Sequence, residues 1–240
     1  MQGYIHSIES LAAVDGEGVR CAVFLSGCPL RCVYCHNPDT WQHGGTPTEG
    51  EALVKKVARF KPYFGDRGGI TFSGGEPLIQ ASFIASVVPL LRKESISYIL
   101  DTSGAVPLSE DVKAAVNGAS SVLLDLKFPD EESYQKYTHS SIKLPLSFLA
   151  YLEQVGKPAV IRTVIVPGIN DSEEWLDRYL AVLSNYSCVT KYELLGFHCL
   201  GFHKYEKLGV ANPLIHTSAM DPERLSVLQE YVNAKKEANE

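Results

Sequence analysis

Directly after an apolar run, the sequence reads Gly27-Cys28-Pro29-Leu30-Arg31-Cys32-Val33-Tyr34-Cys35-His36-Asn37-Pro38 and so places three cysteines in a C-x3-C-x2-C spacing. Cysteine thiolates are the usual ligands of iron-sulfur centres, and a loop this compact can bind three irons of a cubane cluster. The fourth iron then lacks a protein ligand, and an open coordination position is where a substrate or cofactor binds. The loop therefore predicts a catalytic 4Fe-4S cluster on Cys28, Cys32 and Cys35.

Two other interpretations of the cysteine loop stay open. A zinc site could use its three cysteines together with His36, although zinc sites more often use two separated pairs. A disulfide would leave one thiol over, because three clustered cysteines cannot all pair with one another. The other three cysteines of the chain are isolated, and we expect them to be small core residues: Cys21, Cys188 and Cys199.

Outward from this loop, short β-branched runs alternate with helical stretches, which is typical of βα units and a parallel sheet. Six such units follow one another. We therefore expect an α/β fold, an incomplete parallel (β/α)6 barrel that is splayed on one side. The predicted strands cover residues 19–26, 69–73, 97–101, 120–128, 159–166 and 189–196.

Local signals mark several of the helices. Thr48 with Glu51 forms a capping box before an apolar helical face. Ser172 precedes two glutamates, whose charges suit a helix start, and Pro222 is well placed in the first turn of a last helix. Pro89 lies inside a helical pattern and should kink or shorten that helix.

Composition limits the class of protein. With 240 residues, of which 45% are hydrophobic and 21% charged, the chain is long enough for one sizeable core, so we expect a single domain over residues 1–240. The net charge of -6 argues against nucleic acid as the main partner. The first twenty residues supply no apolar signal core and no later stretch has the length of a membrane span, so we expect a cytoplasmic protein that does not bind membranes.

Polar groups recur where the predicted strands end. Ser73-Gly74-Gly75-Glu76-Pro77 follows the second strand, where a glycine pair lets the backbone approach a ligand and a carboxylate can accept from an ammonium group. Charged residues in apolar strands are costly unless paired, and ligand sites of barrels gather at the carboxyl ends of strands. Each charged group could be only a structural ion pair, but together they describe a polar rim for a zwitterionic ligand: Asp101-Thr102, Asp125, Lys127, Arg162 and His198.

The cysteine spacing resembles that of the radical S-adenosylmethionine superfamily, and the Gly-Gly-Glu-Pro sequence is similar to the second motif of that superfamily. Further stretches resemble the activating enzymes of glycyl-radical enzymes, most closely those of pyruvate formate-lyase: residues 3–10, 14–20, 34–41, 124–127 and 164–168. The interval between Cys35 and Gly74 contains no cysteine, so we expect none of the ferredoxin-like insertion found in many other activating enzymes.

The resemblance implies a reaction and its partners. The open iron would bind the amino and carboxylate groups of S-adenosylmethionine, and the reduced cluster would cleave this cofactor to methionine and a 5'-deoxyadenosyl radical. That radical would remove a hydrogen atom from one glycine of pyruvate formate-lyase and leave a stored glycyl radical. The electron would come from a donor of the flavodoxin or ferredoxin type.

The resemblance also implies residue roles. Tyr34 and His36 would pack on the adenine, while Gly74, Gly75 and Glu76 would hold the methionine end of the cofactor. Lys127, Arg162 and His198 would make further cofactor contacts. Asp101, Thr102 and Asp125 could instead form a monovalent-cation site. Asp15 would seat the partner peptide, in a turn where this chain has Glu17 and relatives tend to have proline.

Two other functions stay open at this stage. A different radical enzyme, acting on a small molecule or a nucleotide base, would share the cluster and the glycine motif. An electron-transfer or zinc-binding module would bind metal without cleaving a cofactor.

Overall fold

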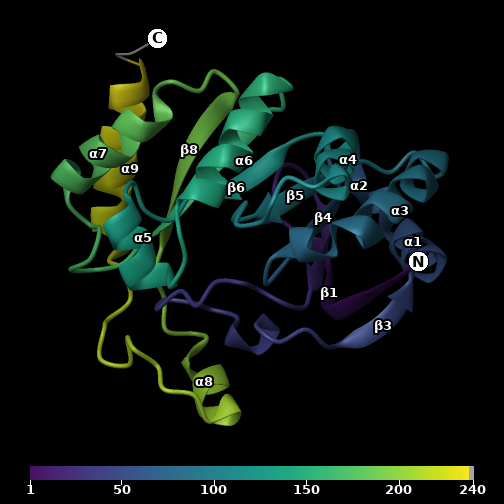
Figure 1. The fold of residues 1–240 in the computed structure, drawn as a ribbon, viewed down its shortest axis with the longest axis horizontal. Helices are drawn as coiled ribbons and strands as arrows, with labels where there is room; N and C mark the ends of the chain where they lie inside the picture. Colours follow the sequence, from purple (N-terminus) through teal and green to yellow (C-terminus); the bar gives the residue numbers. More distant parts are fainter. Residues whose placement is uncertain (238–240) are drawn as a thin grey trace.

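The computed structural model describes residues 1–237, and one sheet of eight strands runs through it (Figure 1). All six strands predicted from the sequence are present, they are parallel, and they lie side by side in chain order. They are β2 (Arg20–Leu25), β4 (Gly69–Gly74), β5 (Tyr98–Thr102), β6 (Val122–Asp125), β7 (Ala159–Ile165) and β8 (Val189–Gly196).

Two antiparallel strands extend this sheet at one edge and were not predicted. β1 (Gln2–Ala12) pairs with β2, and β3 (Thr46–Glu49) pairs with β1. The predicted capping box at Thr48 is wrong, because pairing with β1 keeps the backbone extended as far as Glu49. Helix α1 (Gly50–Val57) therefore begins without a side-chain cap, and the Thr48 hydroxyl donates to the Thr46 carbonyl at 3.1 Å instead.

The other helix signals have mixed outcomes. Ser172 caps α7 (Glu173–Leu183) by accepting from the Trp175 amide at 3.2 Å, as predicted, and α9 (Pro222–Glu237) begins at Pro222. The predicted shortening of the helix at Pro89 is wrong, since α3 (Ala81–Lys93) continues past this residue. Burial of the apolar face of α3 stabilises the helix by more than the loss of one backbone hydrogen bond at Pro89 costs. The remaining helices are α2 (Lys61–Phe64), α4 (Glu110–Gly118), α5 (Glu131–Thr138), α6 (Lys143–Gln154) and α8 (Phe202–Leu208).

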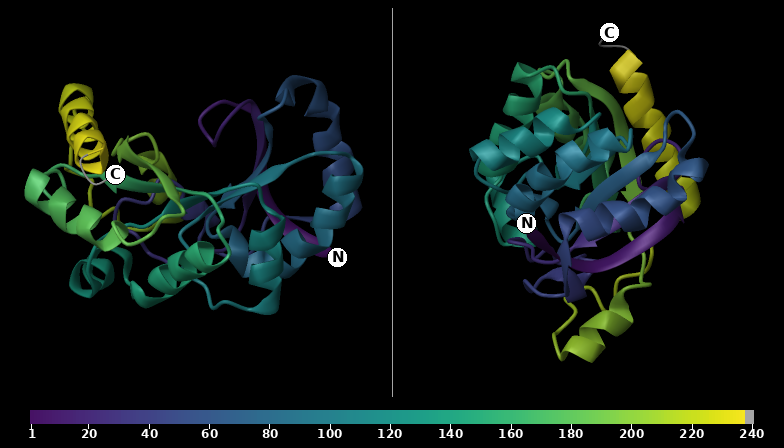
Figure 2. Two further views of the ribbon diagram at one scale, coloured as in Figure 1. Left: turned by 90° about the horizontal axis from the view of Figure 1, so that it is seen from above. Right: turned by 90° about the vertical axis from the view of Figure 1, so that its right-hand side faces the viewer.

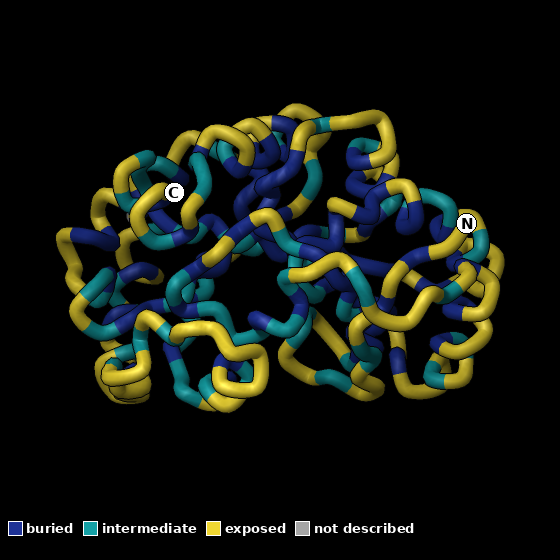
Figure 3. Tube along the Cα trace, turned by 60° about the horizontal axis from the view of Figure 1, so that its bottom comes forward, coloured by how far each residue is buried: buried dark blue, intermediate teal, exposed yellow. Residues whose placement is uncertain are grey.

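The sheet curves but does not close, because its outermost strands β3 and β8 are not paired with each other. Figure 2 shows the strands as a curved layer with helices packed along its outer side. Buried residues follow the strands through the middle of the molecule, and exposed residues lie mainly on outer helix faces and loops (Figure 3). Within residues 1–237, none of the helices combines the length and hydrophobicity that a bilayer crossing requires.

The added strand β1 is tied to the barrel by one buried side chain. Gln80 donates from Nε2 to the carbonyls of Tyr4 (3.0 Å) and Ser26 (2.9 Å), and its Oε1 accepts from the Tyr4 amide at 2.8 Å. These bonds link the start of β1 to the end of β2, from which the cysteine loop departs.

We predict that Gln80→Leu lowers the free energy of unfolding by about 2–4 kcal/mol, because a buried polar group left without a partner costs about 1–3 kcal/mol. Chemical denaturation measures this change. Gln154→Leu, on an exposed face of α6, is the control and should change stability by less than about 0.5 kcal/mol. Equal effects of the two substitutions would contradict a specific role for Gln80.

Candidate active site

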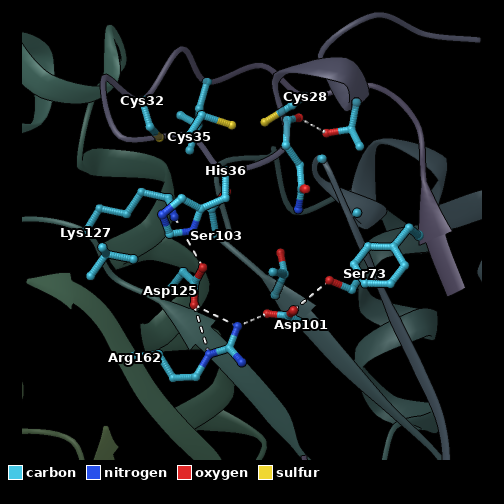
Figure 4. Close-up of a pocket in the computed structure, with 18 of the residues that line it drawn as sticks. Cys28, Cys32, Cys35, His36, Ser73, Asp101, Ser103, Asp125, Lys127 and Arg162 are labelled. Carbon is cyan, nitrogen blue, oxygen red and sulfur yellow. Dashed lines mark hydrogen bonds and ion pairs between the residues drawn. The ribbon is translucent and has the colours of Figure 1, made fainter. Parts of the chain in front are cut away.

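A cavity of about 340 Å³ lies at the carboxyl ends of the six parallel strands, a volume in the range of small-molecule sites. The cysteine loop covers one side and the charged residues of the strands lie opposite (Figure 4). The cavity brings together most of the predicted site residues, whose contacts with a cofactor stay predictions: Asp15, Cys28, Cys32, Tyr34, Cys35, His36, Gly74, Gly75, Asp101, Thr102, Asp125, Lys127 and Arg162. Glu76 and His198 do not line it.

The three cysteines of the loop share one end of the cavity as free thiols. Burial raises the pKa of both Cys28 and Cys32 to about 12. Within residues 1–237, no three histidine, cysteine or carboxylate side chains converge as ligands of a single metal ion.

Backbone hydrogen bonds fix the cysteine loop on both sides. The Gly27 amide donates to the Thr40 carbonyl at 2.7 Å and the Cys28 amide to the Trp41 carbonyl at 3.2 Å. Farther along the loop, the Arg31 and Val33 amides donate to carbonyls at the end of α5, each at 2.9 Å. The loop backbone is therefore anchored both before and between the three cysteines.

The glycine pair after β4 allows the closest approach in the site. A Cβ atom at Gly75 would lie 2.3 Å from the Gly27 carbonyl oxygen, and one at Gly74 would lie 2.1 Å from the Leu25 carbonyl oxygen. The backbone is hydrogen-bonded across the same contact, from the Glu76 amide to the Gly27 carbonyl at 2.8 Å. Glycine at both positions is thus required to seat the cysteine loop against β4, whatever else the pair contacts.

Glu76 lies beneath the cavity wall. The side chain is fully buried, and its carboxylate accepts from the Thr102 hydroxyl (2.6 Å), from the Ser103 amide and hydroxyl (2.9 and 2.5 Å) and from the Leu78 amide (3.0 Å). Burial raises its pKa, and these hydrogen bonds oppose the rise. Glu76 therefore holds the ends of β4 and β5 together, and any contact with a ligand would require it to exchange one of these partners.

A charged network spans the opposite wall. Strand register sets Asp125 of β6 beside Arg162 of β7, and the Arg162 guanidinium bonds both Asp125 (3.1 Å) and Asp101. Lys127 contacts Asp125 at 3.2 Å, and the Ser73 hydroxyl donates to Asp101 at 2.6 Å. Arg162 thus stands between the two carboxylates that the resemblance assigns to a cation site.

The pKa values of the two carboxyl groups in this network are shifted in opposite directions. Burial raises the pKa of Asp101 to about 6, against the opposing charge of Arg162. Burial would also raise the pKa of Asp125, but Lys127 and Arg162 together hold it below its ordinary value. Burial would lower the pKa of Lys127, and Asp125 keeps it well above its usual range. Lys127 therefore carries a positive charge into the cavity at neutral pH.

Two aromatic residues at the cysteine end carry buried polar atoms without partners. The Tyr34 hydroxyl and the His36 Nε2 atom are buried and unbonded within the described residues. His198 lies behind His36, with stacked rings whose centres are 3.7 Å apart. His198 therefore supports His36 from outside the cavity lining, which sequence reasoning could not distinguish from a direct contact.

Arg20 and Thr71 were missed by the sequence analysis. Arg20 is 1% exposed and bonds to no carboxylate in residues 1–237; it donates to the carbonyls of Glu17, Arg67 and Ile70 and to the Thr71 hydroxyl. Thr71 in turn donates to the Asp15 carbonyl at 2.6 Å. The pair fixes the turn that carries Asp15 at the cavity mouth. The sequence did contain a signal for this role, because an arginine at the start of an apolar strand is costly unless its charge has partners.

Comparison with known proteins agrees with this geometry. Residues 14–143 match the family model described as a 4Fe-4S single cluster domain. The chain is 42% identical over 235 residues to the pyruvate formate-lyase-activating enzyme of Clostridium pasteurianum, covering 97% of this chain and 98% of that one. It is 36% identical to the enzyme of the same name from Staphylococcus aureus strain USA300, over 98% of this chain and 97% of that one.

Solved structures share the fold at lower sequence identity. A radical SAM methyltransferase from Sphaerobacter thermophilus matches 90% of this chain and 64% of its own, with a TM-score of 0.62 and 17% identity. A domain of the pyruvate-formate lyase-activating enzyme from Bacteroides vulgatus matches 70% of this chain and 94% of its own, with a TM-score of 0.56 and 20% identity. The predicted fold, an incomplete parallel barrel of the radical SAM type, is confirmed.

We predict that Arg162→Leu lowers the free energy of unfolding by about 3 kcal/mol at pH 7, because it leaves the largely buried Asp101 carboxylate without its counter-charge, while Asp125 keeps Lys127. The loss should shrink as the pH falls from 7 to 5. The pKa of Asp101 is raised from 3.8 to about 6, so the cost of ionising it builds up between these two pH values and is fully present above about pH 6. Loss of Arg162 raises this pKa further, so Asp101 of the variant becomes protonated at a higher pH than Asp101 of the wild type.

Denaturation at several pH values measures this effect. Arg178→Leu is the control, since that arginine is exposed and contacts Asp130 only at 3.7 Å; it should change stability by less than about 1 kcal/mol. A loss for Arg162→Leu that is independent of pH would contradict the assigned role of Asp101.

Proposed function

This chain belongs to the family of pyruvate formate-lyase-activating enzymes, and we infer from that membership and from the cavity that it generates a glycyl radical on pyruvate formate-lyase. The observation that carries the inference is the shared cavity: three free thiols at one end face a charged wall at the other, with a glycine turn between them. When bound, a 4Fe-4S cluster would supply the electron for cleavage of S-adenosylmethionine, which is the radical chemistry that this activity requires.

We assign the cluster to Cys28, Cys32 and Cys35. The donor set fits a cubane with one open iron, since the loop offers three thiols and the cavity offers no fourth cysteine. The loop backbone is hydrogen-bonded to residues on both sides, so the thiols are held at the cavity end before any metal binds.

The remaining cavity residues fit the cofactor S-adenosylmethionine. Lys127 carries a positive charge suited to a carboxylate, and Asp101 and Asp125 carry negative charge suited to an ammonium group or to a monovalent cation. The orphaned Tyr34 hydroxyl and His36 nitrogen offer hydrogen bonds to a polar aromatic ring. Gly74 and Gly75 bring the backbone to the cavity surface. Arg162 orients both carboxylates and keeps them apart.

The partner protein would reach the cavity beside the turn that holds Asp15. Val14 in this turn is 86% exposed, and both Val14 and Asp15 line the cavity, so the turn faces solvent on one side and the cofactor space on the other. Arg20 and Thr71 fix its backbone from below. A glycine-bearing loop of the partner enzyme can therefore contact Asp15 without displacing the cluster loop.

We further propose that residues 1–240 form one domain without a second cluster. The three cysteines outside the loop are separate from one another in sequence, and the interval between Cys35 and Gly74 contains none. The electron must then come from another protein, for which a flavodoxin or ferredoxin-type donor fits. Six unpaired cysteines suit a reducing compartment, so we place the protein in the cytoplasm.

We predict that the anaerobically reconstituted protein binds about four irons and four sulfides per chain. Cys28→Ala, Cys32→Ala and Cys35→Ala should each lose the competent cluster, as measured by iron content and electron paramagnetic resonance. Cys188→Ala and Cys199→Ala are matched controls outside the loop and should keep full iron. Loss of iron in the controls alone would refute the assignment.

A further prediction separates cofactor from partner contacts. Lys127→Met should slow cleavage of S-adenosylmethionine even without a partner, because it removes a buried charge from the cavity. Asp15→Ala should leave partner-free cleavage intact and lower glycyl-radical formation about tenfold, if one charged hydrogen bond is lost. The two assays are 5'-deoxyadenosine formation and the glycyl-radical signal with pyruvate formate-lyase, at matched iron content. Abolished partner-free cleavage in Asp15→Ala would instead place the turn in the cofactor site.

A further inference from the structure

Within residues 1–237, Arg20 is a buried cation that forms no ion pair; it is 1% exposed. Its guanidinium donates from Nε to the Thr71 hydroxyl at 2.8 Å, from Nη1 to the carbonyls of Glu17 and Arg67 at 3.0 Å each, and from Nη2 to the Ile70 carbonyl at 2.7 Å. None of these acceptors carries a negative charge, and a buried charge without a counter-charge is costly. Stability alone would favour an apolar side chain here, so the arginine indicates a role in the site.

The hydrogen bonds of Arg20 join two segments that are distant in sequence. One is the turn at residues 13–19, between β1 and β2, and the other is the segment at residues 65–68 that leads into β4. Thr71 extends the link, because its hydroxyl donates to the Asp15 carbonyl at 2.6 Å. The left view of Figure 2 shows the turn as a purple loop that stands away from the sheet. Arg20 therefore ties an outlying turn to the body of the barrel.

Two glycines pack the turn closely against its surroundings. A Cβ atom at Gly18 would lie 2.6 Å from the Gly68 amide nitrogen, and one at Gly16 would lie 2.2 Å from Cδ1 of Ile99. Both glycines have positive φ angles, +75° at Gly18 and +118° at Gly16, which residues with a side chain rarely adopt. The turn therefore has one close-packed arrangement against these neighbours.

A second link between the two segments lies at the surface. Arg67 Nη1 donates to Glu17 Oε1 at 2.6 Å, but the two side chains are 73% and 69% exposed. Exposed ion pairs contribute little to stability, because water and salt screen them. The buried hydrogen bonds of Arg20 are therefore the main polar link that holds the turn in place.

Arg20 lies outside the space in which a cofactor would bind. Val14 and Asp15 line the cavity, whereas Arg20 and Thr71 do not. Loss of Arg20 should thus leave the cavity wall intact and free the turn. A partner that binds a turn already ordered avoids the entropy cost of ordering it on binding.

We propose that Arg20 is a positioning residue for the partner protein. It holds Val14 and Asp15 in the arrangement that the glycine-bearing segment of the partner contacts, so that this segment binds more tightly. The assignment rests on the proposed function, since it takes that segment to occupy the cavity beside the turn. It adds a residue outside the cavity and outside the cysteine and glycine motifs.

The first test is the KM for pyruvate formate-lyase in Arg20→Met, which keeps an unbranched side chain but removes the guanidinium. At matched iron content, KM in glycyl-radical formation should rise about tenfold while kcat changes less than about twofold, because one charged hydrogen bond to the turn is lost. Formation of 5'-deoxyadenosine without the partner should keep the wild-type rate. Arg178→Met makes the same chemical change at an exposed position of α7 and should leave KM unchanged. A wild-type KM in Arg20→Met, or slowed partner-free cleavage, would overturn the proposal.

A second variant decides the question if Arg20→Met does not fold. Thr71→Val has nearly the same volume and removes only the hydroxyl that links Arg20 to the Asp15 carbonyl. It should raise the KM for the partner about threefold, as expected for one neutral hydrogen bond. The matched control is Thr190→Val, which removes a hydroxyl of β8 that donates to the Ala159 carbonyl at 3.1 Å and should leave KM unchanged. Equal KM values in the two threonine variants would likewise overturn the proposal.

Limited proteolysis separates a local effect on the turn from a general loss of stability. Without the partner, a glutamate-specific protease should cut after Glu17 about tenfold faster in Arg20→Met than in the wild type, because cleavage follows local opening. Cleavage after Glu110, whose side chain is 90% exposed at the start of α4, should keep its wild-type rate. Equal acceleration at both sites would show a merely structural arginine and overturn the proposal. Wild-type protein that forms no glycyl radical would refute the proposed function but leave this cleavage pattern in place, so the two failures are distinguishable.

Discussion

The contact between the Gly74 and Gly75 turn and the end of β2 is the constraint on which the site depends. It brings two backbones so close that a single methyl group at Gly75 would lie 2.3 Å from the Gly27 oxygen. One side of this contact leads into the cysteine loop and the other into Glu76, whose carboxylate holds Thr102 and Ser103. The cysteine loop and the opposite wall of the cavity are thereby placed relative to each other by backbone contacts, with little freedom left to side chains.

Charge in the cavity is arranged around Arg162. The partly buried carboxylates of Asp101 and Asp125 would repel each other and destabilise the fold if neither had a counter-charge. Arg162 bonds both, while Lys127 pairs with Asp125 alone. The arrangement keeps polar groups of both signs at the cavity surface without an unpaired charge. A zwitterionic ligand can replace some of these ion pairs with its own charged groups, and the net charge of the cavity then stays the same.

Sequence alone was sufficient wherever the information is local. The cysteine loop lies within eight residues, and the six parallel strands are marked by β-branched runs, so both were predicted. Features that depend on distant contacts were not: β1 and β3 at the sheet edge, and Tyr205, which meets Cys35 across 170 positions. Glu76 illustrates a further limit of prediction from sequence. Its motif was recognised, but the sequence does not show that its carboxylate accepts four hydrogen bonds from Leu78, Thr102 and Ser103.

The two ends of the chain contribute differently to the site. Residues 14–143, which match the family model, contain the three cysteines of the loop, the glycine turn and both aspartates of the charged network. Arg162, which neutralises those aspartates, and Tyr205, which holds Cys35, lie beyond that range. Without Arg162 the Asp101 carboxylate would lack its counter-charge, and without Tyr205 the Cys35 carbonyl would lose a hydrogen-bond donor. The segment that matches the family model thus contains the cysteines and the two aspartates, while β7 supplies a counter-charge to these aspartates and α8 packs against the cysteine loop.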